Sequence, residues 1–158
     1  MEKKHKKIIV KISLILIFAI SMGYLEAVIA NYDRMILGIS VDYDLKQLPK
    51  FTPKHLFLEQ TREISTIIML FSFGLLIGKT LREKLTIFML SISAWDLFYY
   101  ISLYIILRWP SSLFTTDLLF LVPIPWIAPV ILPVTISIMI ITFSILSLVR
   151  QNYNDNQK

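Results

Sequence analysis

Cysteine is absent from the sequence, and histidine occurs only twice. Without thiols the chain cannot form disulfides, thiolate nucleophiles, Cys-ligated zinc sites or iron–sulfur clusters. One of the two histidines, His5, lies in a basic stretch near the N-terminus. We therefore also expect neither bis-His haem ligation nor a His-rich di-iron site, and the composition leaves the identity of any other cofactor open.

Charged residues are scarce within several long apolar stretches. Of the 158 residues, 56% are hydrophobic, and the mean hydropathy is +0.67, which is more apolar than a typical soluble domain. Little chain remains for a soluble domain once the apolar stretches are counted, so we predict one membrane domain over residues 1–158. The expected fold is all-α, a four-helix transmembrane bundle. The predicted spans are residues 8–30, 53–79, 85–107 and 127–149.

The segments between the spans have their own signals. The basic residues 2–7 and the apolar run after them also fit a signal peptide, but the run is longer than a typical h-region and no convincing cleavage site follows. We therefore expect a retained anchor. Residues 31–52 are expected to form a polar outer loop, Thr52 and Pro53 predict the start of a helix, and residues 150–158 are expected to be a disordered tail.

Prolines interrupt the apolar stretch before the last span. A straight helix cannot contain a closely spaced proline series, because each proline removes a backbone donor and crowds the preceding turn. The sequence therefore predicts a re-entrant or interfacial segment over residues 117–126, followed by a helix kinked near Pro133. The prolines of this stretch are Pro123, Pro125, Pro129 and Pro133.

Lysine and arginine are distributed unevenly between the two ends of the predicted bundle. With both termini cytoplasmic, ten of the 16 basic residues lie inside and six lie outside. This bias favours a multi-pass protein of the plasma membrane with cytoplasmic N- and C-termini. The net charge of +5 is thus explained by span ends and anionic lipid, and we expect no nucleic-acid partner.

Two carboxylates, Glu26 in the first predicted span and Asp96 in the third, interrupt stretches that are otherwise apolar. An ionised group in hydrocarbon costs several kcal/mol, so it usually is paired, faces the bundle interior or has a function. We hypothesise that polar residues of three helices and a loop converge on one outer-facing cavity. The candidate residues are Glu26, Arg34, Glu59, Arg62, Glu63, Asp96, Tyr99, Tyr100, Asp117 and Trp126.

Structural roles are the alternatives for these residues. Glu26 could pair with Arg62 or Arg34 and simply fix the register of two helices. Asp96 could accept a hydrogen bond from a neighbouring tyrosine or serine. Asp117 is more often a helix N-cap than a catalytic acid, and Glu59 fits an ordinary solvated helix end.

Glycines indicate where helices approach closely. Gly23 lies in the first predicted span, and Gly74 and Gly78 form a GxxxG match in the second. Small residues at this spacing are typical of close helix packing in membranes.

The sequence contains no internal repeat, so an inverted-repeat transporter is not supported.

Three stretches together resemble an uncharacterised group of small four-span prokaryotic membrane proteins. The stretches are GYLEA at residues 23–27, WDLFYY at residues 95–100, and WPSSL at residues 109–113 running into DLLFLVPIPW at residues 117–126. With Glu59, Arg62 and Glu63 the resemblance covers most of the chain beyond the N-terminal tail. It implies a four-span membrane fold and supplies no activity.

Three functions compete at this stage. The first is a binding or accessory protein whose polar cluster holds a ligand, a lipid headgroup or a partner helix, in a homo-oligomer or with another membrane protein. The second is a membrane enzyme acting on a lipid-type substrate through its carboxylates, which either hold a divalent metal or act as general acid or base. The third is proton-coupled or ion transport. The candidate metal ligands are Glu26, Glu63, Asp96 and Asp117.

Overall fold

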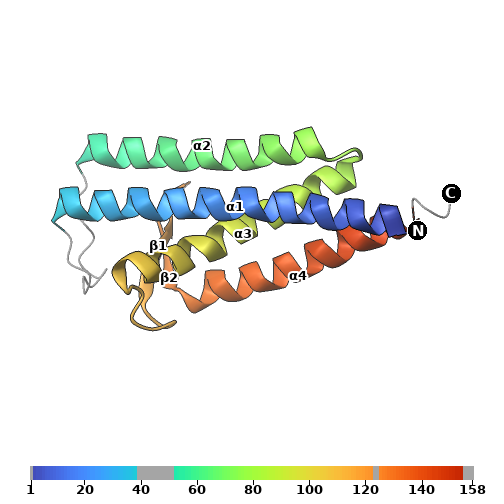
Figure 1. The fold of residues 1–158 in the computed structure, drawn as a ribbon. Coiled ribbons are helices and arrows are strands. Elements are labelled where there is room, and N and C mark those ends of the chain that lie inside the picture. Colours follow the sequence, from blue (N-terminus) through green and yellow to red (C-terminus); the bar gives the residue numbers. More distant parts are fainter. Residues whose placement is uncertain (1, 39–51, 123–124, 155–158) are drawn as a thin grey trace.

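A computed structural model describes residues 2–38, 52–122 and 125–154 of the chain. Four long helices dominate it, and each is long and apolar enough to cross a membrane (Figure 1). The chain is thus a multi-pass, all-α four-helix bundle, as predicted. The elements are α1 (Glu2–Leu37), α2 (Pro53–Ile77), α3 (Leu81–Leu107), β1 (Thr116–Phe120), β2 (Trp126–Pro129) and α4 (Ile131–Asn154).

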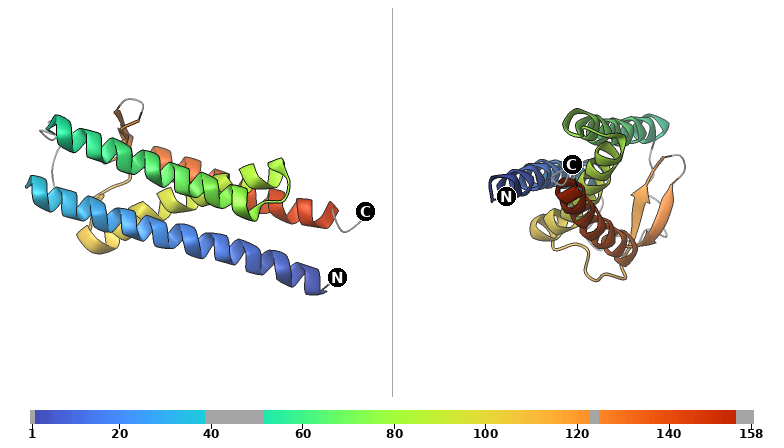
Figure 2. Two further views of the ribbon diagram at one scale, coloured as in Figure 1. Left: turned by 90° about the horizontal axis from the view of Figure 1, so that it is seen from above. Right: turned by 90° about the vertical axis from the view of Figure 1, so that its right-hand side faces the viewer.

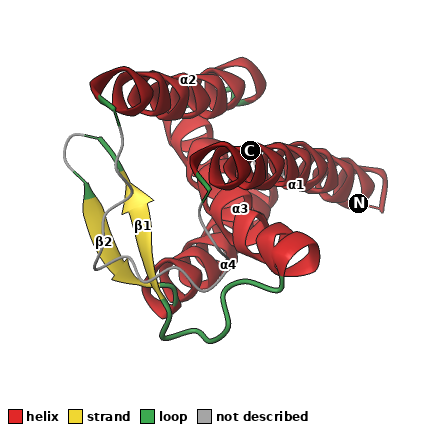
Figure 3. Cartoon of the chain, turned by 90° about the vertical axis from the view of Figure 1, so that its left-hand side faces the viewer, coloured by secondary structure: helices red, strands yellow, loops and turns green. Residues whose placement is uncertain are grey.

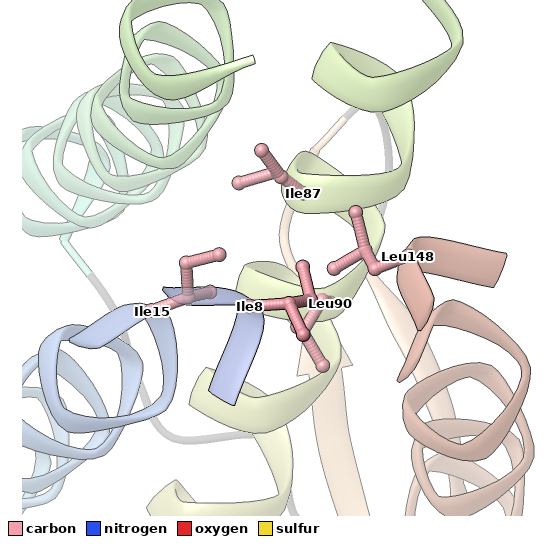
Figure 4. Close-up of a cluster of buried hydrophobic side chains, with 5 residues drawn as sticks. All are labelled: Ile8, Ile15, Ile87, Leu90 and Leu148. Carbon is pink, nitrogen blue, oxygen red and sulfur yellow. The ribbon is translucent and has the colours of Figure 1, made fainter. Parts of the chain in front are cut away.

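Helix α3 is the central element, because α1, α2 and α4 each pack against it (Figure 2). In the 18-residue apolar part of α3, 44% of the residues are buried, against 17–22% in the corresponding parts of the other three helices. Exposed apolar side chains cover the outside of the bundle, which suits contact with lipid. At the end that carries both termini, a buried aliphatic cluster joins α1, α3 and α4 (Figure 4). Its buried members are Ile8, Ile15, Ile87, Leu90 and Leu148.

Gly23 sets the contact between α1 and α3. A Cβ atom at this position would lie 2.6 Å from the carbonyl oxygen of Trp95 and 3.0 Å from the amide nitrogen of Tyr99. Only a residue without a side chain permits this approach. Gly74 and Gly78 lie equally close to the start of α3 at Lys84, so the predicted close packing at these glycines is confirmed.

Three helices extend beyond the predicted spans. Helix α3 begins at Leu81 and not at residue 85. Helix α1 continues through residues 31–37, which were expected to be loop, and ends where Gly38 adopts a positive φ of 63°. Helix α4 continues to Asn154, so residues 150–154 are helical and not a disordered tail. The remaining predicted loop residues, 39–51, and residues 155–158 lie outside the described chain.

Capping explains where α2 and α3 begin. Thr52 caps α2 by accepting a hydrogen bond from the backbone N–H of His55, and Pro53 occupies the first turn, which confirms the predicted start. Thr80 caps α3 in the same way through the N–H of Glu83. Nearby, Lys11 and Glu83 form an ion pair of 2.6 Å between α1 and α3.

The proline-rich segment forms an antiparallel β-hairpin of β1 and β2 beside the helices (Figure 3). The last helix accordingly begins at Ile131 and not at residue 127, so that prediction was wrong. Pro133 lies in the first turn of α4, where its missing N–H interrupts no intrahelical hydrogen bond. Pro123 lies outside the described residues.

Candidate functional site

A cavity of about 170 Å³ lies at the end of the bundle where α1 and α3 end and α2 begins. Figure 3 views the molecule from this end. Strand β1 and the residues after it, up to Leu121, contribute to the lining. Eight of the lining residues are acidic or basic, namely Glu26, Asp33, Arg34, Glu59, Arg62, Glu63, Asp96 and Asp117.

Arg62, which lines this cavity, connects α2 to α1. Its guanidinium forms one ion pair with Glu26 of α1 and another with Glu59 of its own helix, at 2.8 Å. In the second contact two guanidinium nitrogens bind one oxygen, because Nε also donates to Oε2 of Glu59 at 2.9 Å. Of the two partners considered for Glu26, the structure therefore selects Arg62. Arg34 instead lies over the ring of Trp109, 4.2 Å from its centroid.

Three further carboxylates receive hydrogen bonds from neutral donors. Asp96 accepts from the hydroxyl of Ser137 on α4 at 2.8 Å, which is one of the two donor types expected for it. The buried Asp117 accepts from the hydroxyl of Tyr100 at 2.9 Å. Glu63 accepts from the backbone N–H of Leu121 at 2.9 Å. Asp117 lies in β1, so the helix N-cap role considered for it was wrong.

Two buried polar atoms of the lining residues have neither a hydrogen-bond partner nor an ion-pair partner among the described residues. One is Oε1 of Glu63 and the other is Nε1 of Trp95. These two residues are 8% and 6% exposed, respectively. Leaving such an atom unsatisfied costs about 1–3 kcal/mol. A donor and an acceptor in the cavity walls are thus available to a ligand.

Nine of the ten candidate residues line this one cavity, and Trp126 does not. Trp126 begins β2, is 49% exposed and stacks on Phe120. Glu59, expected to be an ordinary solvated helix end, contacts Arg62 and lines the cavity.

Sequence reasoning missed other lining residues. Asp33 follows Glu26 by seven positions, a spacing that returns to the same helical face, but the first span was predicted to end before it. Trp95 and Trp109 were not among the candidate residues, yet both line the cavity.

The predicted metal ligands share the cavity but form no compact group of ligand atoms among the described residues. Glu26, Glu63, Asp96 and Asp117 all line the cavity. Across residues 2–38, 52–122 and 125–154, however, the group whose ligand atoms all lie within 4.8 Å of one another consists of Asp33, His55 and Glu59.

No protein-family model, no curated protein and no solved structure matches this chain. A function must therefore be inferred from the residues that line the cavity. Six carboxylates and two guanidiniums line it, and burial strengthens the effect of that imbalance because the local dielectric constant is low. The cavity is suited to a positively charged group or to protons.

Burial raises the pKa of Asp117 to about 6, with the Tyr100 hydroxyl partly opposing the shift. An unfolded aspartate titrates near 3.9, so between these values the folded protein holds a proton that the unfolded chain releases. The stability contribution of Asp117 is therefore complete below about pH 4 and is lost as the pH rises to about 6.

We predict that the free energy of unfolding of wild type, relative to Asp117→Asn, falls by up to about 3 kcal/mol between pH 4 and pH 7. The asparagine has no titrating group, so the difference between the two proteins isolates Asp117. Chemical or thermal unfolding in detergent across this pH range measures it. A difference that does not change with pH would show that Asp117 titrates normally.

Proposed function

We propose that this membrane protein binds a small, positively charged ligand, such as an amine or an amine-bearing lipid headgroup, in the cavity at the end of the bundle. The observation that supports this most is the charge of the lining, which carries six carboxylates and two guanidiniums. Three of those carboxylates accept hydrogen bonds from neutral donors, and none of the three forms an ion pair among the described residues.

The two arginines do not offset this excess. Arg62 is already shared by Glu26 and Glu59, and Arg34, which lies over Trp109, supplies a single charge near Asp117. A carboxylate without a cation nearby becomes stable in such a site only by binding a proton or a cationic partner. A cationic ligand would supply that partner to Asp96 and Asp117.

The aromatic residues of the lining favour an organic cation. Tyr99 and Tyr100 pack edge to face with their ring centroids 5.1 Å apart, and Trp95 lines the same space. Aromatic faces attract ammonium groups electrostatically. The unpartnered Nε1–H of Trp95 and Oε1 of Glu63 add a donor and an acceptor for the polar part of the ligand.

A membrane-embedded enzyme is the second candidate. Asp117, with its pKa near 6, has the proton affinity that a general acid or base needs at neutral pH. Its hydrogen bond from Tyr100 would orient it for that role. Ligand binding ranks first because the described cavity walls show the charge and the free polar atoms for binding but no assembled nucleophile and base.

We further propose that the cavity faces the outside of the cell, which is supported by the excess of lysine and arginine at the opposite end. The absence of native cysteine makes this easy to test. Ser111 is exposed in the loop after α3, and Tyr153 is exposed near the end of α4.

We predict that a membrane-impermeant maleimide labels Ser111→Cys in intact cells and labels Tyr153→Cys only after lysis. Wild type, which has no thiol, is the blank for both. Labelling of Tyr153→Cys alone in intact cells would reverse the proposed orientation.

Native mass spectrometry of protein purified in mild detergent tests ligand binding. We predict a bound small molecule in wild type that is lost in Asp96→Asn and Asp117→Asn, because each change removes one negative charge from the cavity. Glu83→Gln makes the same type of change at the opposite end of the bundle and should keep the molecule.

The same samples can be titrated with ethanolamine and with uncharged glycerol as probes. Ethanolamine is expected to raise the unfolding temperature of wild type and of Glu83→Gln, and glycerol at equal concentration is not. Ligand-free protein in every sample, together with no response to ethanolamine or other small amines, would contradict the proposal.

A further inference from the structure

We infer that Asp33, His55 and Glu59 form a binding site for a single divalent transition-metal ion, with zinc as the representative. The ligand atoms of these residues all lie within 4.8 Å of one another. Asp33 comes from the last turns of α1, and the other two come from the start of α2. The site shares the cavity and the acceptor atom of Glu63 with the proposed cationic ligand, which would contact Asp96 and Asp117. The zinc titration uses the metal alone, so its outcome does not depend on that ligand.

The start of α2 holds two of the ligands in place. His55 and Glu59 are four residues apart, so they lie one turn apart on the same helical face. The cap formed by Thr52 fixes the first turn through the backbone N–H of His55. Two ligands with this i, i+4 spacing on a helix are a common way to bind zinc.

Arg62 orients the third group. It holds Oε2 of Glu59 through two guanidinium nitrogens, at 2.8 and 2.9 Å, and does not contact Oε1. The same carboxylate shares a hydrogen bond with Asp33, which a bound metal ion would replace. A cation or hydrogen-bond donor behind a metal-binding carboxylate is the usual supporting arrangement in metal sites. The pairing of Glu59 with Arg62 is therefore compatible with metal binding.

The distances suit a small shift into coordination. Two atoms that each lie about 2.1 Å from a tetrahedral zinc ion are about 3.4 Å apart. The three ligand atoms are half-buried and belong to side chains on two different helices, so rotation of the side chains can close the group. A bound ion would also separate the carboxylates of Asp33 and Glu59, which otherwise repel each other.

A second observation points to a ligand at this place. Glu63 lies one turn beyond Glu59 on the same face of α2, and all three acidic residues of this region, Asp33 included, line the cavity. Oε1 of Glu63 is buried without a partner among the described residues. Water bound to the metal on its cavity side is the type of donor that such an acceptor lacks.

The donor set selects the class of metal. One imidazole nitrogen and two carboxylate oxygens suit Zn²⁺, Fe²⁺, Co²⁺ or Mn²⁺ better than Mg²⁺ or Ca²⁺, which prefer oxygen ligands alone. Three protein ligands leave at least one coordination position for water or for a ligand, which is typical of sites that do chemistry or exchange ligands.

Zinc titration of the full chain tests the inference. The protein should carry a tag without histidine and be treated with a chelator before calorimetric titration with zinc chloride. Wild type is expected to bind one equivalent, and His55→Ala and Glu59→Gln are expected to weaken binding by at least about tenfold. His5→Ala is the matched control, because it removes the only other histidine of the sequence. His5 lies about 40 Å from Asp33 along α1.

X-ray absorption at the zinc edge provides a readout that needs no variant. The wild-type spectrum should show one imidazole and the remaining ligands as oxygen. Size-exclusion chromatography of each variant identifies any loss of binding that comes from misfolding. Zinc affinity unchanged in a folded His55→Ala protein, or bound zinc without an imidazole ligand, or no zinc binding to wild type, would overturn the inference.

Discussion

The contact of Arg62 with Glu26 and Glu59 is the interaction on which the polar end of the molecule depends. Helices α1 and α2 both pack on α3, and the Arg62 guanidinium joins them at the cavity. Charged groups in apolar surroundings are tolerated only when paired and hydrogen-bonded. The ion pairs therefore fix where α1 and α2 meet, and with them the positions of the other acidic residues.

Helix α3 and the hairpin complete the site from the other side. The close approach at Gly23 places α1 against the turn of α3 that carries Asp96 and Tyr99. The hairpin is held over the cavity by the hydrogen bond from Leu121 to Glu63 and by that from Tyr100 to Asp117. The polar groups at this end thus both hold the fold together and line the space available to a ligand.

The four spans, the capped start of α2 and the close contacts at glycine could be predicted, because they follow from local patterns of hydropathy, capping and residue size. Long-range geometry could not. The hairpin was missed because proline-rich apolar sequence also suits a re-entrant segment, and its strands are short. Asp33 and His55 were missed as partners since they belong to different helices, and the first helix was predicted to end at residue 30. The outward position of Trp126 depends on the strand register, which the sequence does not specify.

A double-mutant cycle on Glu26 and Arg62 tests the central claim most directly. The free energies of unfolding of wild type, Glu26→Gln, Arg62→Gln and the double variant would be measured in the same detergent. If the ion pair joins α1 to α2, the two changes should be non-additive, with a coupling free energy of about 1–3 kcal/mol. Effects that add to within about 0.5 kcal/mol would show that the two residues do not interact, and would contradict the account.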